Sequence, residues 1–184
     1  MERRKPALRV WTVLAVLPDG RLASAGRDGR VLVWDPADPA AGPAELAGRH
    51  DGGVYAMALL PDGRLASGGR DGRVLVADPA DPGAGPAELA GRHDDIVTAL
   101  AVLPDGRLAS GGRWRVLVWD TQSGPARSLL VCSAFALATS PSPSGACLFI
   151  GHARGGISCW EVRAPAQQTL EPGSTQGNAM QQQA

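Results

Sequence analysis

The sequence has few aromatic residues, a single lysine and only three cysteines in 184 residues. The number of cysteines is odd, and none of them forms a Cys-x-x-Cys pair; they are Cys132, Cys147 and Cys159. This argues against a disulfide framework and a zinc knuckle. The net charge is zero, so the basic excess of nucleic-acid binders and polybasic membrane binders is missing. No apolar run approaches the roughly 18 residues of a membrane span. We therefore predict a cytoplasmic protein without nucleic-acid or membrane partners.

What the sequence does have is a repeat. The octapeptide Leu-Pro-Asp-Gly-Arg-Leu-Ala-Ser occurs at Leu17–Ser24, Leu60–Ser67 and Leu103–Ser110, each copy 43 residues after the last. A second shared block follows each copy, and the third block is one residue shorter than the others. A period of about 40–45 residues with strand-like patterning is typical of β-propeller blades. The first apolar stretch resembles a signal peptide, but it recurs inside the chain and is interpreted as a strand.

The middle unit contains the segments of one complete blade. Val54–Leu60 is apolar on both alternating faces, as expected of an innermost strand between neighbouring blades. Turn sequences rich in proline, aspartate and glycine follow it. We predict the further strands at 64–68, 73–77 and 87–90. The sequence therefore predicts an all-β propeller built of four-stranded antiparallel blades.

These units resemble the WD-repeat (tryptophan–aspartate repeat) family. Trp34-Asp35 and Trp119-Asp120 match the signature dipeptide at the end of the third strand, and His50 and His93 lie where the family places its histidine. The resemblance implies a network in each blade that links a histidine, a strand hydroxyl, a turn aspartate and the tryptophan. By position, its members are Ser24, Asp28 and Trp34 in the first unit, His50, Ser67 and Asp71 in the second, and His93, Ser110 and Trp119 in the third.

No unit matches the family's network completely. The first unit has Ala7 at the histidine position, and the second has Ala77 at the tryptophan position. The third reads Gly112-Arg113-Trp114-Arg115 at the turn and so lacks the aspartate. Because partly satisfied buried networks are costly, we expect these blades to be softer than typical ones.

The repeat predicts one propeller segment over residues 1–163, with blades at about 7–47, 48–90, 91–131 and 132–163. The fourth unit is degenerate: an inner strand is expected at Ala134–Thr139, and Pro141–Gly145 replaces the usual turn. Residues 164–184 are polar and rich in glutamine, which predicts a disordered tail, with a weak outer strand near 168–171 as the alternative.

About four blades are fewer than this family commonly uses, although propellers run from about four to eight. A partial ring would expose the outward faces of its first and last blades, and exposed apolar faces are sticky. Three explanations stay open: self-association to complete the ring, completion by another chain, and truncation from a longer parent.

Residues that could support catalysis do not form a recognisable constellation. His50 and His93 occupy equivalent positions in adjacent blades, too far apart to share one metal ion with His152. No segment fits a phosphate-binding loop or a nucleophile elbow. The predicted innermost strands carry no carboxylates. We therefore predict no enzyme activity and no catalytic, cofactor or metal-binding residues, and we expect Cys147 and Cys159 to be buried free thiols.

The candidate binding residues are Arg27, Arg70 and Arg113, which recur on equivalent turns, together with Trp114. They predict a protein partner, such as an acidic or phosphorylated peptide. A solvated face balanced by nearby aspartates, with Trp114 a product of repeat decay, is the alternative interpretation. The function predicted is a non-enzymatic protein–protein interaction scaffold. The alternatives are the C-terminal part of a larger signalling protein's sensing propeller, or a gene fragment without independent function.

Overall fold

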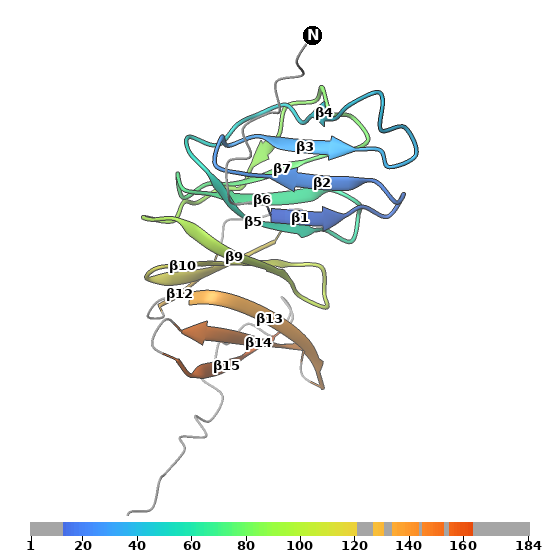
Figure 1. Cartoon of the computed structure of the whole chain (residues 1–184). Helices are drawn as coiled ribbons and strands as arrows, with labels where there is room; N and C mark the ends of the chain where they lie inside the picture. The colour runs from blue at the N-terminus through green and yellow to red at the C-terminus, as the bar shows by residue number, and fades with distance from the viewer. Residues whose placement is uncertain (1–12, 121–126, 131–133, 144, 153–154, 164–184) are drawn as a thin grey trace, which may run out of the picture.

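The computed structural model describes residues 13–120, 127–130, 134–143, 145–152 and 155–163, and every regular element in them is a β-strand. The strands form four antiparallel sheets in chain order, each of which is one blade (Figure 1). Blade 1 contains β1 (Val13–Val16), β2 (Leu22–Ala25), β3 (Val31–Trp34) and β4 (Ala44–Glu45); blade 2 contains β5 (Val54–Leu59), β6 (Leu65–Gly69), β7 (Val74–Ala77) and β8 (Ala87–Glu88). Blade 3 contains β9 (Val97–Val102), β10 (Leu108–Gly112), β11 (Arg115–Trp119) and β12 (Arg127–Leu130); blade 4 contains β13 (Ala134–Ser142), β14 (Gly145–His152) and β15 (Ile157–Arg163).

The repeated Pro-Asp-Gly sequence makes the same turn between the first two strands of blades 1, 2 and 3. Its glycines, Gly20, Gly63 and Gly106, all have φ of 87°, a left-handed conformation that glycine adopts without strain. In the middle copy the Leu60 N–H donates to the Arg64 carbonyl at 2.8 Å, and the Gly63 N–H donates to the Leu60 carbonyl at 3.0 Å. Identical sequence therefore produces identical local structure in three blades.

Neighbouring blades pack through an alternation of small and large side chains. The face that each blade turns toward the next, here called its front face, carries alanine, glycine and valine, such as Ala66, Val74 and Val76 of blade 2. These residues pack against Leu108, Leu117 and Trp119 on the opposing face of blade 3, here called its back face. Similar clusters join blades 1 and 2 and blades 3 and 4. The core is thus divided into three layers between blades rather than gathered at one centre.

The two end faces of this row of blades expose apolar side chains. On the back face of blade 1, Leu14 and Val16 are each 67% exposed, and Trp34 is 41% exposed. On blade 4, Phe135 and Ile157 are 56% and 76% exposed. The described residues therefore form a partial ring, as the sequence predicts.

Blade 4 departs from the expected pattern in two ways. It has three strands among the described residues, and the alternative strand near 168–171 lies outside them. The innermost strand β13 also extends to Ser142 rather than ending at Thr139, with Pro141 opposite Ala146. Proline is tolerated there because β13 is an edge strand, whose outer side needs no ladder donor.

The two cysteines in the described part of blade 4 are free, but the expectation that both are buried was wrong. Cys159 is exposed and Cys147 is half-buried. They lie on β14 and β15 of blade 4, which is the last blade in the described part of the chain. Partial burial, followed by a hydrogen bond with Cys147, raises the pKa of the Cys159 thiol, so the two sulfurs are neighbours.

Candidate functional site

The network of blade 2 is built around Asp71. The His50 Nδ1–H donates to Asp71 Oδ1 at 2.9 Å, and His50 Nε2 lies 2.9 Å from Ser67 Oγ. Asp71 also accepts from the Asp51 N–H at 2.9 Å and from Arg73 Nε at 2.8 Å. Burial raises the pKa of Asp71, but the hydrogen bonds from His50, Asp51 and Arg73 outweigh it and hold that pKa far below its ordinary value. The aspartate therefore ties the loop before β5 to the turn after β6.

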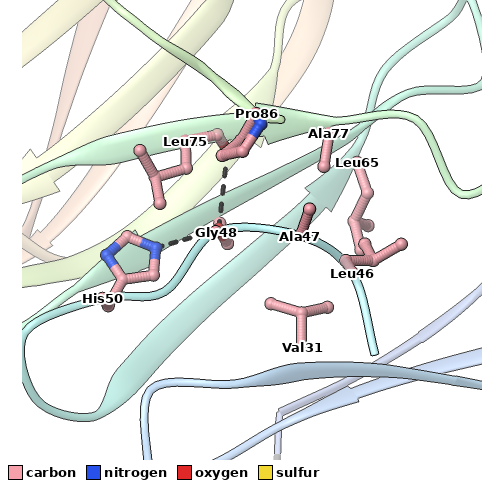
Figure 2. A pocket seen from close by; sticks show the side chains of 10 residues that line it. Val31, Leu46, Ala47, Gly48, His50, Leu65, Leu75, Ala77 and Pro86 are labelled. Carbon is pink, nitrogen blue, oxygen red and sulfur yellow. Dashed lines mark hydrogen bonds between the residues drawn. The ribbon is translucent and has the colours of Figure 1, made fainter. Parts of the chain in front are cut away.

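A pocket lies at the position that lacks a tryptophan in blade 2. Figure 2 shows the pocket beside Ala77, lined by Leu46, Leu65, Leu75 and Pro86. Pro86, from the proline-rich loop, packs so closely on Gly48 that a Cβ added to that glycine would lie 2.2 Å from the proline Cγ. Sequence reasoning identified the missing ring but not the contact between Pro86 and Gly48, since that contact joins two loops of irregular sequence.

In blade 3 the tryptophan is present and the aspartate is not. Trp119 Nε1 donates to Ser110 Oγ at 2.7 Å, and His93 Nε2 lies 2.7 Å from the same oxygen. Burial, and secondarily the nearby charge of Arg115, lowers the pKa of His93 to about 4, so the ring is neutral at pH 7. The structure brings together the three residues that the resemblance placed here.

Blades 1 and 4 hold shorter versions. In blade 1, Trp34 Nε1 donates to Ser24 Oγ at 2.7 Å on the open back face, while Asp28 accepts from the Arg30 N–H at 3.3 Å. In blade 4, His152 Nε2 lies 2.9 Å from Ser158 Oγ, which also accepts from Trp160 Nε1 at 3.2 Å. Sequence reasoning missed this group because its serine lies on the third strand, whereas the other blades carry it on the second.

The hydrogen-bonded side chains Ser67, His50 and Asp71 follow one another in the order of a hydrolase triad. Their burial, however, fits a structural link between the loop and the strands. His50 and Ser67 are 3% and 5% exposed, so a substrate could not reach the serine without unfolding the loop. Among the described residues, no group of three or more histidine, cysteine or acidic side chains could hold a metal ion. The described residues also contain no helix that is long and apolar enough to cross a membrane.

The arginines that recur in each blade fall into three sets with different surroundings. Arg21, Arg64 and Arg107 are each held by the aspartate two residues earlier, with Nε–Oδ2 distances of 2.6, 2.7 and 2.8 Å. Arg30, Arg73 and Arg115 each pair with an acidic side chain. The third set consists of Arg27, Arg70 and Arg113, the sequence-predicted binding residues, all of them exposed.

The exposed set lies on the turns between the second and third strands. Arg27 and Arg70 form no side-chain hydrogen bond or ion pair with any residue that the structure describes. They flank Gly53, whose carbonyl accepts from the Arg70 N–H at 2.8 Å and whose Cβ position is 3.2 Å from Arg27 Cα. Arg113 stacks on Trp114 with 5.1 Å between its guanidinium carbon and the ring centroid, and Trp114 is 57% exposed.

Comparisons with known proteins agree with this architecture. A family model described as "WD domain, G-beta repeat" matches residues 7–35, 45–78 and 88–120, which is more than half of the chain. A chain in the crystal structure of a mitotic checkpoint complex has a TM-score of 0.67 and 25% identity, covering 82% of this chain and 48% of that one. The WD40 β-propeller domain of Doa1 has a TM-score of 0.67 and 17% identity, covering 80% and 49%. This chain thus spans about half the length of each, and a search of curated proteins found no match.

Proposed function

Since this chain belongs to the WD-repeat family, described as "WD domain, G-beta repeat", we propose that it is a non-enzymatic scaffold for protein–protein interaction. The observation that carries the proposal is the contrast among the arginines. The other two recurring sets are held by aspartate or glutamate. In the third set Arg113 NH1 lies 3.7 Å from Asp95 Oδ2, whereas Arg27 and Arg70 are exposed and without an ionic partner in the described structure. The similarity to a chain of a mitotic checkpoint complex supports protein partners as a class.

The partner proposed is an acidic or phosphorylated peptide that lies across the turns carrying Arg27, Arg70 and Arg113. Guanidinium groups bind carboxylate and phosphate oxygens through paired hydrogen bonds, and the exposed Trp114 supplies an aromatic contact at one end of the row. The protein is proposed to meet this partner in the cytoplasm.

The test is binding of a fluorescein-labelled hexaglutamate peptide to the full chain, followed by anisotropy. The double variant Arg27→Gln with Arg70→Gln should weaken binding about tenfold or more, because two charge-assisted contacts are lost. The matched control is Arg21→Gln with Arg64→Gln, which removes the same charge from the turns at the other end of the strands and should change binding less than twofold. An equal loss of peptide binding in both double variants would mean that net charge alone determines binding, which would contradict the proposal.

Self-association is a second proposal, favoured by the exposed apolar side chains on both end faces. Two chains would supply eight blades, which lies within the range of known propellers. The remaining alternatives are that the chain is part of a larger signalling propeller, or a fragment without independent function. A cooperative thermal melt of the full chain would argue against the last of these.

A further inference from the structure

The lost aspartate of blade 3 leaves its hydrogen-bond donors in place. In blade 2, Asp71 accepts from His50 Nδ1–H and from Arg73 Nε–H. The equivalent donors in blade 3 are His93 Nδ1 and Arg115 Nε. Arg115 Nε is buried and has no hydrogen-bond partner in the part of the chain that the structure describes. The Arg115 guanidinium otherwise keeps the arrangement of Arg73, since its NH2 group donates to the Arg92 carbonyl as Arg73 does to Arg49.

The hydrogen bonds of Ser110 fix the proton on His93. Ser110 is completely buried, and its Oγ accepts from Trp119 Nε1–H, a group that can only donate. The only acceptor that the described structure offers to the Ser110 hydroxyl proton is His93 Nε2, at 2.7 Å. The neutral ring must therefore carry its proton on Nδ1. His93 is 4% exposed, and among the described residues neither its Nδ1–H nor the buried Arg115 Nε–H has an acceptor.

We propose that the short turn of blade 3 is a carboxylate-binding site, in which an Asp or Glu side chain of a protein partner takes the place that Asp71 holds in blade 2. The carboxylate accepts from His93 Nδ1–H and Arg115 Nε–H, one neutral donor and one cationic donor. This inference deepens the proposed function and rests on it, because it assigns one acidic residue of the partner to a defined site.

The Arg115 side chain is 27% exposed, so the partner carboxylate is proposed to approach the two donors along it. Asp94 contacts the Arg115 side chain through a single hydrogen bond, which Arg115 NH2 donates to Asp94 Oδ1 at 3.2 Å. Because the Asp94 side chain is 74% exposed, it can turn into water when a second carboxylate arrives. The adjacent Trp114 and Arg113 then lie beside the peptide that carries that carboxylate. A monoanionic carboxylate suits two donors next to Asp94 better than a dianionic phosphate does.

The experiment is a titration of the full chain with sodium acetate, with sodium chloride at equal ionic strength as the control, followed by the arginine Nε–H signals in NMR. Acetate should shift the Arg115 signal in a saturable way, while the Arg73 signal, already bonded to Asp71, stays in place. The second arm uses the peptide Ser-Gly-Glu-Gly-Ser and its Glu→Gln counterpart. The glutamate peptide should shift the Arg115 signal at lower concentration than acetate, and the glutamine peptide should not shift it.

Two variants sharpen the result. Trp114→Asp with a glycine inserted after position 114 rebuilds the turn of blade 2, so it should abolish the acetate response and raise the melting temperature. Arg115→Lys keeps the charge but removes the Nε–H donor, and it should weaken binding of the glutamate peptide about tenfold. Arg64→Lys, a matched change on an arginine whose Nε is already bonded to Asp62, should leave the acetate response of the Arg115 signal unchanged.

Failure of this inference differs from failure of the scaffold proposal. If hexaglutamate binds through Arg27 and Arg70 while the Arg115 Nε–H signal does not shift with acetate, the scaffold proposal stands and the carboxylate site is overturned. An acetate response without one to the glutamate peptide overturns the assignment to a partner side chain. Equal acetate shifts at Arg73 and Arg115 mean a nonspecific ion effect and also overturn it.

Discussion

At the residue scale, the blades differ in which residues of the histidine–serine–aspartate–tryptophan network they retain. Blade 2 keeps the aspartate and loses the tryptophan ring, and blade 3 does the reverse. The two losses have different consequences. A pocket lined by Leu46, Leu65 and Pro86 lies beside Ala77, whereas nothing in the described structure accepts from Arg115 Nε. A missing apolar group leaves unfilled space, but a missing acceptor leaves hydrogen-bond donors unpaired.

The first prediction concerns Asp71. The variant Asp71→Ala leaves His50 Nδ1–H and Arg73 Nε–H without their acceptor, so the free energy of unfolding should fall by about 3 kcal/mol. The matched change Asp28→Ala removes the same turn position in blade 1, where the carboxylate accepts from the exposed Arg30 N–H, and should cost less than about 1 kcal/mol. Urea unfolding followed by circular dichroism measures both. Equal losses would show that turn geometry, rather than the buried network, determines the effect.

The second prediction follows from His93, whose pKa falls from about 6.5 in the unfolded chain to about 4 in the folded protein. The unfolded state binds the proton more readily, so the contribution of His93 is fully present above about pH 6.5 and is lost as pH falls toward 4. Over this window the free energy of unfolding should decrease by about 3 kcal/mol. Urea midpoints between pH 7.5 and 4 test this, and the variant His93→Gln should show a shallower dependence. A wild-type dependence no steeper than that of the variant would contradict it.

At the element scale, turns and strands of the first three units are readable from sequence because local signals and the repeat agree. Positive φ at Gly63 and the apolar residues on both faces of β5 follow from short stretches of residues. Blade 4 was harder, since its inner strand continues through Pro141, which only its edge position permits. The contact of Pro86 with Gly48 was not predictable, because it depends on how the loop before β5 and the loop between β7 and β8 approach one another.

The third prediction separates conformational strain from steric overlap in these loops. Gly48 and Gly42 have φ of 86° and 75°, so alanine at either should cost about 1 kcal/mol of strain. At Gly42 a Cβ meets nothing within 4 Å, whereas at Gly48 it overlaps Pro86. We expect Gly48→Ala to destabilise the protein by about 1–3 kcal/mol more than Gly42→Ala. Thermal unfolding of the two variants measures this difference, and a value near zero would mean that Pro86 moves away freely.

At the scale of the whole molecule, the open back face of blade 1 repeats a face that is buried elsewhere in the chain. Its residues are Leu14, Val16, Leu22, Ser24, Leu32 and Trp34, and the back face of blade 3 carries the same residue types at Leu100, Val102, Leu108, Ser110, Leu117 and Trp119. In blade 3 this face packs against alanine and valine side chains. The open face is therefore already shaped for a front face of small residues.

The fourth prediction applies this complementarity to self-association. The front face of blade 4 carries Phe149 where blade 3 has Ala109, and the ring is 37% exposed. If two chains join blade 4 to blade 1, Phe149→Ala should tighten the dimer by removing bulk opposite Leu22, by about 1–3 kcal/mol. Sedimentation equilibrium measures this, with Trp34→Ser as the variant expected to loosen it. Weaker association of Phe149→Ala would instead identify the ring as the main contact.

The near-identity of the interfaces also bears on how such a gene can change. Repeated DNA recombines out of register, and each such exchange adds or removes one whole 43-residue unit. Here the front faces of blades 1 and 2 differ by Ala25 against Gly68 and by Val13 against Ala56, and the back faces of blades 1 and 3 do not differ at the positions compared. A chain one blade longer would therefore form interfaces almost the same as those it already has. The number of blades is the property of this molecule that mutation can alter most easily without redesigning any contact.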